Sequence, residues 1–177
     1  MLGSTIYRSA LRLTGRTAWC TSAGGSNPLQ RVEADIAARY PVVRHDPPER
    51  LAERVGPVRA GIVLFDVRAA AEFEVSHIDG AVRLDPAMLA DEFRKSHAQL
   101  IVGRDVILYC AIGLRSARLA ERLQFVMVQA GARSVINLSG GIFRWHNEGR
   151  PLANAAGDTR AVHPFNAHWA RFLLPKF

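Results

Sequence analysis

The chain has 177 residues, of which 49% are hydrophobic and 22% are charged. This length suits one domain and is short for two, and the composition excludes an intrinsically disordered chain. The longest apolar runs, such as 61–65 and 106–109, are far shorter than a membrane-spanning helix. We therefore expect a globular protein that has no membrane partner.

The net charge of +7 comes entirely from the two ends of the chain. Residues 1–31 and 160–177 contain basic residues and no acidic ones, so the segment between them is neutral. A nucleic-acid-binding domain carries its basic patch on the folded body. The charge pattern therefore predicts that nucleic acid is not a partner of this protein.

The basic N-terminal segment, residues 1–27, has no acidic residue and is rich in Ser, Thr and Gly. Arg8, Arg12 and Arg16 recur at every fourth position and would share one side of a helix. This composition is typical of a mitochondrial targeting peptide. If the segment acts as one, we expect a protein of the mitochondrial matrix, and otherwise a cytoplasmic protein with an ordinary N-terminal arm.

Residues 28–45 form a helical arm, because apolar residues recur at helical spacing from Leu29 to Tyr40. Asp46 before two prolines predicts an N-cap and a short helix that ends near Gly56. Strands are then expected at Gly61–Asp66, Ala81–Leu84, Asp105–Cys110 and Ser134–Leu138. Helices are expected at Ala69–Ser76, Met88–Ser96, Arg115–Gly131 and Ile142–Gly149.

Strands rich in Val, Ile and Leu that alternate with helices indicate the α/β class, with a mostly parallel central sheet and helices on both faces. Right-handed crossovers place functional residues at the carboxyl ends of such strands. The C-terminal extension, residues 153–177, contains the aromatic residues Phe165, Trp169 and Phe172. We expect it to pack back on the domain.

The segment around Cys110 carries the chemistry, because a buried strand runs into this cysteine and a short loop leads to a helix near Arg115. Successive backbone N–H groups before a helix N-terminus form a nest for an anion. Such a nest stabilises a thiolate, which is the nucleophilic form of cysteine. The structural alternative is that Cys110 only ends a core strand, since buried cysteines are common.

The two cysteines, Cys20 and Cys110, are too few for a disulfide framework and favour a reducing compartment. No Cys or His spacing in the sequence indicates zinc. We therefore expect no bound metal and no other cofactor.

Four separated segments resemble the rhodanese-like family, and they occur in the family's order. They are Leu64–Arg68 with Glu72 and Phe73, Ser76–Ala81, Cys110–Ser116, and Leu138–Ile142 with Trp145 and Gly149–Leu152. The resemblance implies that residues 46–152 form a rhodanese-like domain. Its one departure is the helix expected at 115–131, where Phe125–Val128 looks like an insertion that would lengthen the helix or add a bulge.

The resemblance implies a thiosulfate sulfurtransferase of the rhodanese type. Cys110 would carry sulfane sulfur as a persulfide, from a small donor such as thiosulfate to a thiol or cyanide acceptor. The substrate would be bound by the loop residues Ala111, Ile112, Gly113, Leu114, Arg115 and Ser116. Arg115 would add a charge at the rim of the loop and Ser116 a hydroxyl. Asp66 and Arg68 are expected to support the site, Asp66 by accepting backbone hydrogen bonds and Arg68 by pairing with Glu72 at helical spacing.

Three alternatives stay open. Cysteine phosphatases of this fold place their arginine six positions after the cysteine, whereas Arg115 lies five positions after Cys110. A cysteine phosphatase is therefore a weaker alternative than a sulfurtransferase. A regulatory module that binds a partner protein would not need Cys110. A sulfur-relay protein would use the same loop to accept sulfur from a partner, and only kinetics with defined donors would distinguish it.

Overall fold

The computed structural model describes residues 27–54 and 61–174. The expected targeting segment, apart from Asn27, lies outside these residues, and so does the expected helix end near Gly56. Among the described residues, every helix is too short or too polar to cross a bilayer.

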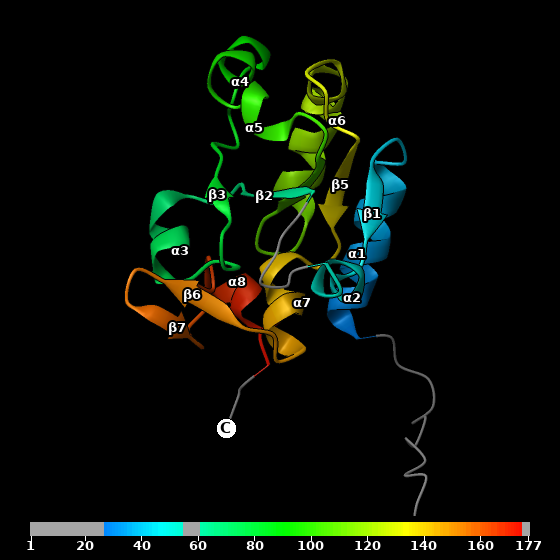
Figure 1. The fold of residues 1–177 in the computed structure, drawn as a ribbon. Helices are drawn as coiled ribbons and strands as arrows, with labels where there is room; N and C mark the ends of the chain where they lie inside the picture. Colours follow the sequence, from blue (N-terminus) through cyan, green and yellow to red (C-terminus); the bar gives the residue numbers. More distant parts are fainter. Residues whose placement is uncertain (1–26, 55–60, 175–177) are drawn as a thin grey trace, which may run out of the picture.

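A sheet of five parallel strands forms the centre of the described structure, in the order β1-β5-β4-β2-β3 (Figure 1). The strands are β1 (Arg44–Asp46), β2 (Ile62–Asp66), β3 (Val82–Arg83), β4 (Asp105–Tyr109) and β5 (Ser134–Leu138). The central strands β2, β4 and β5 are buried along almost their whole length. This is the burial that a parallel sheet covered by helices on both faces requires.

Helices alternate with these strands. They are α1 (Pro28–Arg39), α2 (Pro48–Ala52), α3 (Ala70–Val75), α4 (Ala90–Ser96), α5 (Ala98–Ile101), α6 (Leu114–Gln129), α7 (Gly141–Asn147) and α8 (Ala167–Ala170). A hairpin of β6 (Leu152–Asn154) and β7 (Gly157–Thr159) follows α7. Figure 1 shows α7, α8 and this hairpin gathered near the carboxyl ends of the strands, which is the edge where the site lies.

The structure confirms the α/β class and the parallel sheet, and the four expected strands are present to within one residue at each end. The expectation for Asp46 was wrong. Asp46 lies in β1, an additional strand that was not predicted, and β1 pairs with β5. Pro47 is the N-cap residue of α2 and makes no side-chain hydrogen bond there. The carboxylate of Asp46 instead forms ion pairs with Arg44 and Arg50. Helix α6 passes through Phe125–Val128 without interruption, so this segment adds no bulge.

Strand β4 and helix α6 hold the ends of the loop that begins at Cys110. Strand β4 lies between β2 and β5, and Leu108 and Tyr109 at its end are fully buried. Helix α6 buries Ala120, Leu123 and Met127 at helical spacing. Burying one large aliphatic side chain contributes about 1.5–3 kcal/mol, so both ends of the loop are firmly anchored.

Candidate active site at the Cys110 loop

The loop between β4 and α6 turns tightly around the sulfur of Cys110. The Cys110 side chain is buried, and the residue is only 1% exposed. The backbone N–H of Gly113 donates a hydrogen bond to its Sγ at 3.2 Å. Gly113 has a φ of +96°, a conformation that strains residues with a side chain. A Cβ at this position would also lie 3.2 Å from the carbonyl oxygen of Leu138, so the conformation favours glycine and the space for a side chain is tight.

Helix α6 begins at Leu114, directly after Gly113. The first N–H groups of a helix have no partner within it, and the positive end of the helix dipole lies there. Both features favour a negatively charged group at the loop.

The start of α7 closes the loop from the other side. The N–H groups of Ile142 and Phe143 donate to the carbonyl oxygens of Cys110 and Ala111, at 2.9 and 3.0 Å. Gly141 makes this approach possible, because a Cβ there would collide with both carbonyl oxygens. The contact of Gly141 with the Cys110 loop was not predicted from the sequence.

Arg115 lies in the first turn of α6 and forms a bidentate ion pair with Glu72 of α3. Its Nη1 and Nη2 donate to the two carboxylate oxygens, each at 2.8 Å. The N–H of Ala69 donates to the same carboxylate at 3.0 Å. On its other side the guanidinium lies over the Phe165 ring, with Cζ 4.8 Å from the ring centroid. Arg115 is therefore fixed between a carboxylate and an aromatic ring.

These contacts change the acid–base behaviour of the pair. Burial alone would raise the pKa of Glu72, but the hydrogen bonds from Arg115 and Ala69 outweigh it, and the pKa is lowered. Burial alone would lower the pKa of Arg115, but Glu72 and the nearby Cys110 outweigh it, and the pKa is raised. The pair therefore stays charged over the ordinary pH range.

Asp66 and Arg68 form a second ion pair, in which both side chains are fully buried. Arg68 Nη2 donates to Asp66 Oδ2 at 2.6 Å and to the carbonyl oxygen of Ser76 at 2.5 Å. The backbone N–H of Arg68 donates to Asp66 Oδ1 at 3.0 Å. The expected pairing of Arg68 with Glu72 was wrong, because Arg68 binds Asp66 and Glu72 binds Arg115. Neither Asp66 nor Arg68 lines the cavity described next.

A cavity of about 230 Å³ opens at the loop. Its lining is mostly apolar and consists of Cys110, Ala111, Ile112, Leu114, Arg115, Phe165 and Trp169. Of the loop residues expected to bind substrate, four thus line the cavity, and Gly113 instead contacts the sulfur. The prediction that Ser116 presents a hydroxyl at the rim was wrong, because this residue is 0% exposed and lies outside the lining.

Sequence analysis missed Phe165 and Trp169 as site residues and expected them only to pack on the domain. Among the described residues other than glycine, Phe165 alone has a positive φ, of +66°. Such a conformation costs about 1–3 kcal/mol and persists only where neighbouring structure holds it. The backbone N–H of Phe165 donates to His163 Nδ1 at 3.0 Å, and further along Asn147 of α7 bonds the backbone of Phe172 and Leu174 at 2.7 and 2.9 Å. No local signal joins this segment to Arg115.

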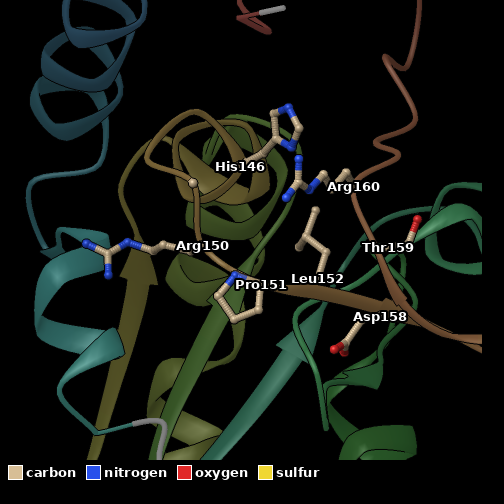
Figure 2. Close-up of a pocket in the computed structure, with 8 residues that line it drawn as sticks. His146, Arg150, Pro151, Leu152, Asp158, Thr159 and Arg160 are labelled. Atoms are coloured by element: carbon tan, nitrogen blue, oxygen red, sulfur yellow. The ribbon is translucent and has the colours of Figure 1, made fainter. Parts of the chain in front are cut away.

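A larger cavity, of about 700 Å³, lies between the end of α7 and the β6–β7 hairpin (Figure 2). It is lined by His146, Gly149, Arg150, Pro151, Leu152, Asp158, Thr159 and Arg160. In Figure 2 the Arg160 side chain points toward His146 and the Arg150 side chain points away from it. Arg150 pairs with Glu148 at 2.8 Å. No cysteine lines this cavity, whereas Cys110 lines the smaller one.

The described residues contain no group of three or more His, Cys, Asp or Glu side chains placed to hold a metal ion. The Cys110 loop thus brings together a buried sulfur, the N–H of Gly113 that donates to it, one paired guanidinium and an apolar wall.

Comparison with known proteins gives consistent matches. The family model described as Rhodanese-like domain matches residues 48–148. The chain is 38% identical over 90 residues to the probable adenylyltransferase/sulfurtransferase MoeZ of Mycobacterium tuberculosis, which is 51% of this chain and 21% of MoeZ. It is 29% identical over 109 residues to a sulfurtransferase of Allochromatium vinosum, which is 62% of this chain and 94% of that protein.

Among solved structures, a thiosulfate sulfurtransferase from Pseudomonas aeruginosa superposes with a TM-score of 0.55 at 20% identity. The match covers 82% of this chain and 26% of that one. At this identity the likeness shows the fold. The chain spans about a fifth of MoeZ and most of the Allochromatium protein.

Proposed function

This chain belongs to the rhodanese-like domain family, and from that premise we propose that it is a sulfurtransferase in which Cys110 carries the transferred sulfur as a persulfide. One observation carries the proposal. The buried sulfur of Cys110 accepts the N–H of Gly113 at 3.2 Å and borders a cavity of about 230 Å³. A buried sulfur that accepts a backbone N–H at the start of a helix suits a reaction in which negative charge stays on sulfur throughout.

The proposed first half-reaction loads Cys110. Its thiolate attacks the outer sulfur of a donor, for which thiosulfate is the simplest example. A bond forms from Sγ to that sulfur, the sulfur–sulfur bond of thiosulfate breaks, and sulfite leaves with the bonding electron pair. The loop now holds a persulfide anion, whose terminal sulfur is the group to be transferred.

The second half-reaction unloads it. An acceptor thiolate attacks the terminal sulfur and leaves with it as a persulfide, or cyanide leaves as thiocyanate. The electron pair of the broken bond returns to Cys110 as the thiolate, which completes a ping-pong cycle. The N–H of Gly113 and the start of α6 serve both halves, because each form of Cys110 is an anion.

The cavity favours small partners over a protein tail. A volume of about 230 Å³, walled by Phe165 and Trp169, suits a small donor and a small thiol acceptor. In a sulfur relay, Cys110 would react in the same way but would receive its sulfur from a partner protein. Comparison of a protein persulfide with a small donor distinguishes the relay from the thiosulfate reaction. A phosphatase reaction is disfavoured because Arg115 follows Cys110 after only five positions, and its guanidinium already binds Glu72.

Mass measurement of the intact protein tests the proposal. Incubation with thiosulfate should add the mass of one sulfur atom, and a later addition of cyanide should remove it. Cys110→Ser should gain no sulfur, because the hydroxyl replaces the nucleophile. Full labelling of this variant would show that Cys110 is not the carrier. No labelling of the parent by thiosulfate or by any organic donor would overturn the proposed function.

A further inference from the structure

We propose that Phe165 and Trp169 determine donor specificity, selecting a sulfane-sulfur donor that has an apolar group beside the reacting sulfur over inorganic thiosulfate. This inference rests on the proposed sulfur transfer at Cys110 and names its substrate class. Phe165 and Trp169 come from the segment after the β6–β7 hairpin, and both line the cavity at the loop.

The first support is the chemistry of the wall. Beside Cys110 and Arg115, the lining consists of the apolar residues Ala111, Ile112, Leu114, Phe165 and Trp169. An apolar substituent gains free energy when it leaves water for such a wall. The three oxygens of thiosulfate would lose their hydration and find few polar partners among these side chains.

The second support is the state of Arg115, the one cation among the residues that line the cavity. Both of its terminal nitrogens donate to the buried carboxylate of Glu72, at 2.8 Å each, and the Phe165 ring covers its other side. The charge of Arg115 is therefore largely balanced before a donor arrives. A dianion such as thiosulfate therefore finds little net positive charge to bind. A monoanion with an apolar group needs less positive charge, because part of its binding free energy comes from apolar contacts.

The third support is the way the aromatic wall is held in place. Phe165 has a left-handed backbone conformation, with a φ of +66°, that a bulky residue rarely adopts. The Trp169 ring packs against the buried Phe172 with a centroid distance of 5.5 Å. Asn147 then ties this segment to α7. A strained backbone that places an aromatic ring against Arg115 and on the wall of the cavity suits a functional position.

The reaction with such a donor balances in the same way. With an aryl thiosulfonate, the Cys110 thiolate attacks the terminal sulfur and the bond between that sulfur and the sulfonyl sulfur breaks. The aryl sulfinate leaves with the electron pair, and the persulfide remains on Cys110. The apolar group is one bond away from the breaking bond, so it would lie against Phe165 and Trp169.

The experiment compares benzenethiosulfonate with methanethiosulfonate, because the two donors share the reacting group and differ in the apolar substituent. We expect the full chain to favour the benzene donor in kcat/KM for sulfur loading by about 10-fold or more. Phe165→Ala and Trp169→Ala should bring this ratio toward one. Phe165→Leu keeps an apolar side chain, so its kcat/KM ratio between the two donors should fall less than that of Phe165→Ala. Thiosulfate, as a third donor, should load the parent more slowly than the benzene donor.

Phe125→Ala is the matched control, because Phe125 is 69% exposed on α6 and lies outside the cavity lining. Its donor ratio should equal that of the parent. A parent ratio near one, or an unchanged ratio in folded Phe165→Leu and Trp169→Ala, would overturn the proposal while sulfur loading itself remained.

A second measurement does not depend on turnover or on a variant that folds. Benzenesulfinate should protect Cys110 of the parent from alkylation at about 10-fold lower concentration than methanesulfinate. Equal protection would also overturn the proposal. If no donor loaded the parent but benzenesulfinate still protected Cys110 better than methanesulfinate, the apolar binding site would stand. That result would contradict only the proposed sulfur transfer.

Discussion

Two arginine–carboxylate pairs lie close to the Cys110 loop, and they differ in access to the cavity. In the Asp66–Arg68 pair both side chains are 0% exposed, whereas in the Glu72–Arg115 pair Arg115 is 28% and Glu72 3% exposed. The first pair can only hold the end of β2 and the turn to α3, because nothing in the cavity reaches it. The second pair has one open face on the cavity. An arginine–carboxylate pair thus stabilises the fold in one place and contributes to the wall of the cavity in the other.

The comparison predicts that the fully buried pair matters most for stability. Asp66→Ala should lower the free energy of unfolding by about 3–5 kcal/mol, because it leaves the guanidinium of Arg68 buried and without its counter-charge. Urea unfolding of parent and variant measures the difference. Asp91→Ala breaks the exposed Asp91–Arg94 pair and should cost at most about 1 kcal/mol. Equal losses in the two variants would contradict the comparison.

The Glu72–Arg115 pair should matter for activity and, more weakly, for stability. Arg115→Ala should lower kcat/KM for sulfur transfer by about 10- to 100-fold, because it removes the guanidinium that lines the cavity and supports the Phe165 ring, and it leaves the negative charge of Glu72 unbalanced near Cys110. It should also cost about 1–3 kcal/mol, since the buried Glu72 carboxylate loses two hydrogen bonds.

The double variant Glu72→Gln with Arg115→Ala separates these two effects. It removes the unpaired carboxylate and should regain stability in urea unfolding without regaining activity. Recovered turnover in the double variant would show that Arg115 acts only through the fold.

The smallest effect concerns pH. Arg115 and the N–H of Ala69 hold the pKa of Glu72 below its ordinary value near 4.5, although burial opposes them. The folded state therefore releases this proton more readily than the unfolded state. The resulting stability is fully present above about pH 4.5 and is lost as the pH falls through the lower folded pKa. Glu72→Gln should flatten the acid side of a plot of unfolding free energy against pH. An identical acid limb in both proteins would contradict the assignment.

Local patterns predicted the parts of the site that are local. The apolar run before Cys110 and the glycine after it were sufficient to place the loop between β4 and α6. Strand β1 has three residues, two of them charged and one a histidine, and its pairing with β5 is long-range, so no local pattern indicated it.

The errors at the site also have physical reasons. Helical spacing between Arg68 and Glu72 suggested an ion pair, but α3 begins only at Ala70, so Arg68 is not on the helix. Ser116 is near the loop in sequence, but it lies on the face of α6 that packs inward beside Ala117 and Ala120. Phe165 reaches Arg115 only because the segment after β7 folds back, and no pattern of spacing encodes that contact.

The contact between α7 and the loop has a consequence for the energetics of catalysis. The N–H groups of Ile142 and Phe143 hold the carbonyl groups of Cys110 and Ala111 on the side away from the helix start of α6. With these carbonyls bonded, the peptide planes of the loop cannot rotate without breaking hydrogen bonds of 2.9 and 3.0 Å. The dipoles around Sγ are thus oriented in advance, and in the proposed reaction little reorganisation would accompany the change from thiolate to persulfide. Any side chain at position 141 would force α7 away from the loop and remove this preorganisation.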